Sequence, residues 1–109
     1  MVYIAVLKDY ALRLMKLEKT DEYQAWFTSL PHKLVKARIE ARIRRPQDGN
    51  PGDVEPVGGG VSELKLHFGS GWRVYYTERN GQIIILLAGG NKSTQKRDIS
   101  LALMLARNL

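Results

Sequence analysis

Three consecutive strand-like segments between Val61 and Ala88 constrain the fold of this chain most strongly. The first two, Val61 to Phe68 and Trp72 to Glu78, alternate apolar and polar residues, whereas "QIIILLA" from Gln82 to Ala88 is apolar throughout. Alternation is typical of a strand with one solvated face, and an unbroken apolar run is typical of a strand covered on both faces. The short turns "GSG" and "RNG" therefore predict an antiparallel arrangement with "QIIILLA" as its central strand.

The residues before this region predict one strand and two helices. "LMKLEKT", from Leu14, alternates as a strand does, and "TDEYQAWFTSL" then offers Thr20 or Asp21 as the N-cap of a short amphipathic helix. A second helix is predicted to carry Pro31 in its first turn and to end before Pro46, because the residue preceding a proline disfavours helical angles.

The loop-rich stretch "PQDGNPGDVEPVGGG" predicts only a brief edge strand, Val54 to Val57, in which Pro56 is tolerated. The end of the chain, with Ser93 or Thr94 as cap, predicts a helix that packs on the sheet. The whole chain has 109 residues, which suits one domain, residues 1–109. The expected class is α+β: two N-terminal helices and one C-terminal helix on a four- to five-stranded, antiparallel-dominated sheet.

Charge and composition exclude several kinds of function. With 17 Lys and Arg against 11 Asp and Glu, the net charge is +6, so nucleic acid is the first partner to consider, ahead of an acidic protein or a membrane surface. No cysteine is present, and His32 and His67 alone offer no zinc spacing. No phosphate-binding loop, dinucleotide fingerprint or membrane-length apolar run occurs. A cytoplasmic protein without metal, cofactor or membrane span is expected.

The hairpin "ELKLHFGSGWRVYY" places cations at alternate positions. If its loop is "GSG", the apolar side chains face the helices and the polar ones share the other face. This register pairs His67 with Arg73, Lys65 with Tyr75, and Glu63 with Thr77. The polar face is either an ordinary solvated surface or a site, and spacing alone favours neither.

Two further basic segments accompany the hairpin. In "GGNKSTQKRD", paired glycines permit unusual backbone angles, and Lys92, Lys96 and Arg97 gather at a helix N-terminus, where an anion is favoured. Alternatively, Lys96 and Arg97 point into solvent. The second predicted helix, with Arg42 and Arg45 among six cations against Glu40 alone, is a candidate polyanion surface, although a solvated face is the more common explanation.

These residue types suit metal-free RNA cleavage, in which a ribose 2′-hydroxyl attacks the adjacent phosphate. The reaction needs proton transfer and cations that stabilise charge on the phosphoryl group. Arg73 can hold two phosphate oxygens, Lys65 and Lys92 can add charge, and His67 can transfer protons. Tyr75 can stack on a base or donate a hydrogen bond, and is equally compatible with a structural role.

The motifs "AWFTSL", "KARIEARIRR", "GGGVSELKLHFGSGWRVYY" and "IILLAGGNKSTQKRDI" resemble the addiction-module killer proteins, a phage-related branch of the RelE/HigB-like toxins in the ParE/RelE superfamily. The resemblance runs from about Leu14 to Ala106 and leaves residues 1–13 outside. It implies a RelE-like fold and a type II toxin that cleaves mRNA, usually on the translating ribosome. A cognate antitoxin, often of the helix-turn-helix type, would neutralise it.

The resemblance also implies roles for single residues. By position, Lys65 looks like a sheet lysine, Arg73 like the hairpin arginine that holds the scissile phosphate, and Lys92 like a basic residue after the last strand. Two positions depart from the pattern: the terminal segment has no tyrosine, and Glu63 stands where RelE carries another lysine. His67 is then a substitute for proton transfer. The alternatives are a non-catalytic nucleic-acid-binding module and a decayed toxin that still partners its antitoxin.

Overall fold

The computed structural model describes residues 15–47 and 52–109, so the segment 1–13, which lies outside the family resemblance, also lies outside the described residues. Five strands form one sheet in the order β1-β5-β4-β3-β2, antiparallel except for the parallel pair β1–β5. The elements are β1 (Lys16–Lys19), α2 (Asp21–Ser29), α3 (Lys33–Gln47), β2 (Val54–Gly58), β3 (Val61–Lys65), β4 (Arg73–Arg79), β5 (Ile83–Gly90), the short 3-10 helix η1 (Lys92–Thr94) and α4 (Gln95–Arg107). The predicted α+β class is confirmed.

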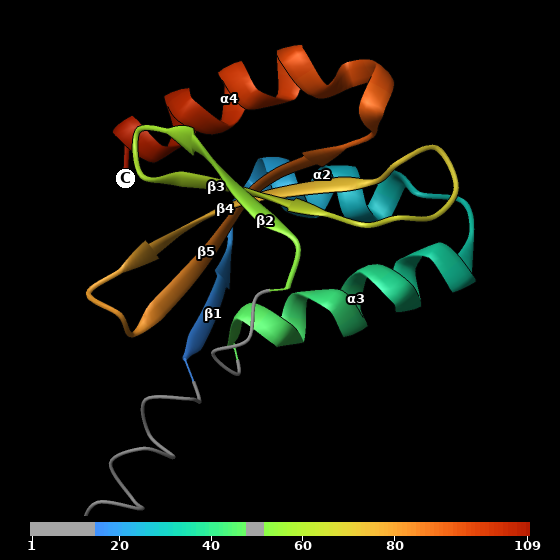
Figure 1. Cartoon of the computed structure of the whole chain (residues 1–109), viewed down its shortest axis with the longest axis horizontal. Helices are drawn as coiled ribbons and strands as arrows, with labels where there is room; N and C mark the ends of the chain where they lie inside the picture. Colours follow the sequence, from blue (N-terminus) through green and yellow to red (C-terminus); the bar gives the residue numbers. More distant parts are fainter. Residues whose placement is uncertain (1–14, 48–51) are drawn as a thin grey trace, which may run out of the picture.

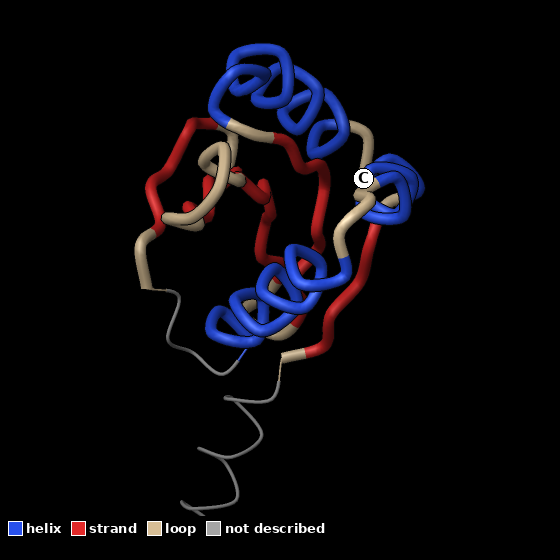
Figure 2. Tube along the Cα trace, turned by 90° about the vertical axis from the view of Figure 1, so that its right-hand side faces the viewer, coloured by secondary structure: helices blue, strands red, loops and turns tan. Residues whose placement is uncertain are grey.

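Helices cover both faces of the sheet (Figure 1). One core joins α2 and α3 to the face that carries Leu64, Val74 and Ile84. A second core joins α4 to the face that carries Tyr75 and Leu87. The turned view in Figure 2 shows helices on either side of the strands. The hairpin face expected to meet solvent is therefore partly covered by α4.

The N-terminal elements form largely as predicted. Thr20 caps α2: its hydroxyl oxygen accepts from the Tyr23 N–H at 3.0 Å and its hydroxyl donates to the Leu87 carbonyl at 2.6 Å. Two predicted limits of the second helix are wrong, because α3 begins at Lys33, after Pro31, and continues through Pro46. A proline near a helix end removes only one hydrogen bond and disfavours, without forbidding, a helical residue before it.

The hairpin register differs from the prediction by two residues. Lys65 lies opposite Arg73 and Glu63 opposite Tyr75, and the Leu66 N–H donates to the Trp72 carbonyl at 3.0 Å. The loop between the strands is therefore longer than "GSG". Because strand side chains alternate with a period of two, a shift of two residues leaves each side chain on its predicted face while changing its partner.

The strand β5 lies between β1 and β4 and is buried along nearly its whole length, so the predicted cover on both faces is confirmed. The predicted central position is wrong, because β4 is the middle strand of the five. The prediction that Gly89 and Gly90 adopt unusual backbone angles is wrong, since neither has a positive φ. A Cβ on Gly89 would overlap the Trp26 ring of α2, and a Cβ on Gly90 would overlap the Asp98 carboxylate of α4. These glycines allow two helices to approach the strand from opposite sides.

No helix in the described part of the chain has the length and apolar character that crossing a bilayer requires.

Candidate functional site

Lys65, Arg73 and Lys92 form a cation cluster at one end of the sheet. Lys65 and Arg73 are cross-strand neighbours on β3 and β4. Lys92 joins them through the hairpin loop, because its N–H donates to the Ser70 carbonyl at 3.4 Å and a Cβ on Gly71 would lie 3.3 Å from Lys92 Cβ and 3.7 Å from Arg73 Nη1. The three residues implied by the family resemblance are therefore brought together.

The Arg73 side chain is largely buried, with 12% of its surface exposed, and its hydrogen bonds are long. Its Nη1 donates to the carbonyls of Gly71 and Trp72, both at 3.3 Å, and its buried Nε has no hydrogen-bond acceptor among the described residues. The nearest carboxylate is Glu63, whose Oε2 lies 3.9 Å from Nε, beyond hydrogen-bond distance. Nη donors with such long hydrogen bonds can also donate to a phosphate oxygen, whereas the buried Nε is not within a ligand's reach.

Tyr75 and Glu63 are buried beneath α4 beside this cluster. The Tyr75 hydroxyl donates to Glu63 Oε2 at 3.0 Å, and Gln95 Nε2 of α4 donates to the same oxygen at 2.6 Å. Burial, followed by the charge of Glu63, raises the pKa of Tyr75 far above its ordinary value. With none of its surface exposed, Tyr75 cannot stack on a base, and its structural role is the one that the packing supports.

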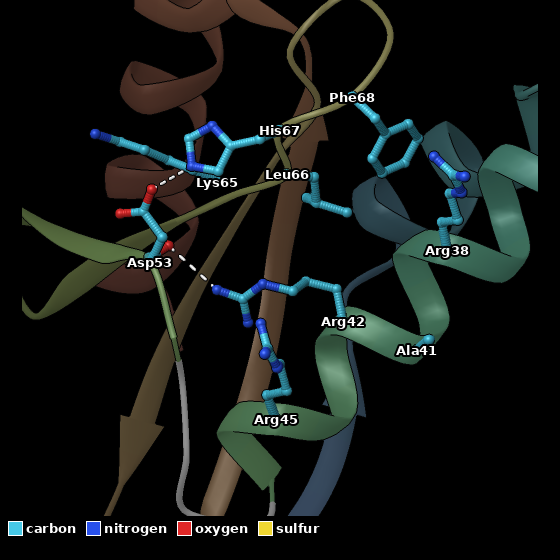
Figure 3. A pocket seen from close by; sticks show the side chains of 9 residues that line it. All are labelled: Arg38, Ala41, Arg42, Arg45, Asp53, Lys65, Leu66, His67 and Phe68. Atoms are coloured by element: carbon cyan, nitrogen blue, oxygen red, sulfur yellow. Dashed lines mark hydrogen bonds and ion pairs between the residues drawn. The ribbon is translucent and has the colours of Figure 1, made fainter.

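A second basic feature, the α3 groove, lies between α3 and the end of β3 (Figure 3). It encloses about 400 Å³. Its lining consists of Arg38, Ala41, Arg42 and Arg45 from α3, and Asp53, Lys65, Leu66, His67 and Phe68 from the facing segments. Lys65 therefore lines the groove and also belongs to the cation cluster.

Asp53 orients side chains in the groove. Its carboxylate pairs with His67 Nε2, and its backbone carbonyl accepts from Arg42 Nη2 at 3.3 Å (Figure 3). The hydrogen bond with His67 lowers the pKa of Asp53 below its ordinary value. Lys65 instead pairs with Glu55 at 2.9 Å, and this hydrogen bond raises the pKa of Lys65. The predicted pairing of His67 with Arg73 is therefore wrong, because His67 extends past the strand ladder towards Asp53.

Lys96 and Arg97 do not line the α3 groove. They line a shallow pocket of about 420 Å³ on α4 with Ser93, Thr94 and Ser100. The backbone amides expected to receive an anion are already satisfied, since the Asn91 side chain accepts from the N–H groups of Ser93 and Thr94. The two side chains are exposed, which agrees with the alternative that they point into solvent.

Sequence reasoning missed Asp53, Phe68 and Gln95 as parts of these features, whereas Arg38 was among the six cations of the predicted basic helix. Asp53 directly precedes β2, whose pairing with β3 brings its carbonyl to the Lys65 N–H at 3.1 Å. An acidic residue one position before a predicted edge strand is the signal that could have identified it. Gln95 carries no such signal, because its contact with Glu63 depends on where α4 docks.

Comparison with known proteins relates the chain to one protein family. The family described as phage derived protein Gp49-like (DUF891) matches residues 25–106. An uncharacterized protein of Haemophilus influenzae is 43% identical over 95 residues, which cover 87% of this chain and 96% of that protein.

Two solved structures share the fold. A mutant of the E. coli toxin RelE in the free state superposes with a TM-score of 0.68 at 16% identity, covering 88% of this chain and 99% of that one. The intact E. coli RelBE toxin–antitoxin complex contains a chain with a TM-score of 0.59 at 14% identity, covering 71% of this chain and 95% of that one. The fold of this chain is therefore RelE-like.

Proposed function

The chain belongs to the phage-derived Gp49-like family, and from this premise and the cation cluster we propose that it is the toxin of a type II toxin–antitoxin module. In this proposal it is an mRNA endoribonuclease that works without a metal ion, in the cytoplasm and on the translating ribosome. The RelE-like fold supports the proposal, since one structure that shares it is a toxin and another is a toxin–antitoxin complex.

The observation that carries the proposal is the convergence of Lys65, Arg73 and Lys92 at one end of the sheet. When a ribose 2′-oxygen attacks the adjacent phosphorus, negative charge develops on the phosphoryl oxygens. The planar fork of Arg73 can bind two of these oxygens, and the two ammonium groups add positive charge. Stabilisation of this kind accelerates the reaction only if it is stronger in the transition state than in the bound substrate.

His67 is the proposed proton acceptor. Because its Nε2 is engaged by Asp53, its Nδ1 is the nitrogen available to RNA. In the reaction the bond from O2′ to phosphorus forms and the bond from phosphorus to O5′ breaks. The proton of the 2′-hydroxyl passes to Nδ1, and the departing O5′ takes a proton from solvent. Asp53 holds the imidazole in one orientation and stabilises its positive charge after transfer.

The proposed partner is a cognate antitoxin, in this branch a helix-turn-helix protein, encoded beside the toxin. Co-expression with the product of the adjacent reading frame and co-purification of the two proteins tests this part. A non-catalytic nucleic-acid-binding module is the second candidate, favoured by the arginines of the α3 groove. RNA binding without any cleavage product would support that candidate.

The test is mapping of mRNA ends during translation with wild type, Arg73→Ala and Lys65→Ala. Arg73→Ala should lower the cleavage rate roughly 100-fold or more, as loss of one transition-state donor does in other enzymes. Arg79→Ala is the matched control, since Arg79 lies on the same strand but is exposed at its other end. Cleavage that is unchanged in both cluster variants refutes the assignment.

A further inference from the structure

The α3 groove carries positive charge that the protein does not neutralise. Arg38, Arg42 and Arg45 form no ion pair with any described residue. The carboxylate of Asp53, the one acidic side chain among the described residues of the lining, is engaged by His67. Helix surfaces that serve only solubility usually intersperse both signs of charge, whereas a concave surface of one sign attracts an oppositely charged ligand.

Arg42 has donors that lack good acceptors. Its Nη2 donates to the Asp53 carbonyl at 3.3 Å, a long hydrogen bond, and its buried Nη1 has no acceptor among residues 15–47 and 52–109. An oxygen-rich anion in the groove would be a second acceptor for Nη2, whose hydrogen bond to the Asp53 carbonyl is long.

An apolar, aromatic surface adjoins these arginines. Leu66 and Phe68 line the groove, and the Arg38 guanidinium carbon lies 5.0 Å from the centre of the Phe68 ring. Guanidinium planes and aromatic rings are the surfaces on which unpaired bases stack. At 1.5 Å per residue, the three arginines extend along about 10 Å of α3, which suits a short polymer better than a single ion.

We infer that the α3 groove is a second binding site for single-stranded RNA, in which Arg42 and Arg45 bind backbone phosphate and Phe68 with Arg38 receives a base. Lys65 connects this site to the cation cluster, so one strand can occupy both. The choice of RNA as the nucleic acid rests on the proposed function. An acidic peptide would neutralise the arginines but would not use the aromatic surface.

The test measures binding of a short, labelled 2′-O-methyl oligonucleotide, which lacks the attacking hydroxyl, by fluorescence anisotropy at several salt concentrations. Arg42→Gln combined with Arg45→Gln should weaken binding roughly 10-fold or more. It should also reduce the slope of log affinity against log salt by about 1.4, which corresponds to two phosphate contacts on a single strand. Phe68→Leu should weaken binding without changing that slope, because it removes stacking and no charge.

The matched control is Lys33→Gln combined with Arg44→Gln, which removes the same charge from the same helix outside the groove. Equal losses in the two double variants overturn the inference, because net charge alone would then explain binding. Arg45→Gln alone, at an exposed position, guards against misfolding of the double variant. A groove variant that loses binding of a labelled oligoglutamate but retains oligonucleotide binding also overturns it. Because no cleavage occurs in this assay, its result is independent of the Arg73 test.

Discussion

Replacing Tyr75 with phenylalanine tests whether this tyrosine is structural or functional. The substitution removes one hydroxyl, which donates at 3.0 Å to the buried carboxylate of Glu63. A hydrogen bond to a charged group contributes about 1.5–3 kcal/mol, so the free energy of unfolding should fall by about that amount. For a domain of this size, the melting temperature should fall by roughly 6 °C or more.

The assay is urea and thermal unfolding, with Tyr76→Phe as the control. Tyr76 is the next residue and is also buried, and its hydroxyl forms a hydrogen bond with the neutral Ser62. Removing this hydroxyl should lower the free energy of unfolding by only about 0.5–1.5 kcal/mol. The proposed RNA cleavage, measured for Tyr75→Phe well below its melting temperature, should stay within a few-fold of wild type. A Tyr75→Phe protein that is as stable as wild type but cleaves poorly would refute the structural role.

Substitutions at three further positions test the fold and the groove. Thr20→Ala should lower the free energy of unfolding, measured in urea, by about 1–2 kcal/mol, because the N-cap of α2 is lost. Thr20→Ser keeps a capping hydroxyl and should retain most of the wild-type stability. Gly90→Ala should lower the free energy of unfolding by about 1–3 kcal/mol or more, since the added Cβ would overlap Asp98. An unchanged urea midpoint would contradict this packing. Asp53→Asn should destabilise the protein at neutral pH and no longer do so at low pH. The pKa of Asp53 is lowered in the folded state, so its stabilisation is present above the ordinary value of 3.8 and is lost as the pH falls through the lowered pKa. A stability difference that is independent of pH would argue against the pair with His67.

Elements specified by local patterns were predictable. The Thr20 cap precedes apolar residues at helical spacing, and the unbroken apolar run in β5 reports burial on both faces. Each of these signals depends only on neighbouring residues. The faces of Lys65 and Arg73 were also predictable, because the two-residue error in register preserved them.

Features that depend on tertiary docking were not predictable from the sequence. Tyr75 belongs to the second core because α4 covers that face, and an alternating strand does not reveal which helix will lie on its polar side. His67 pairs with Asp53, which lies 14 positions earlier in the sequence, directly before the short strand β2. The candidate cations were thus identifiable by type and spacing, whereas their partners required the fold.

Each glycine at the end of β5 also constrains which residues can evolve on one of the two helices. Gly89 adjoins Trp26 on α2, and Gly90 adjoins Asp98 on α4. A relative could carry a larger residue at 89 only with a smaller side chain at 26, and a larger residue at 90 only with a change at 98. These two position pairs should therefore covary in an alignment, each independently of the other, and second-site revertants of Gly89→Ala should arise at Trp26.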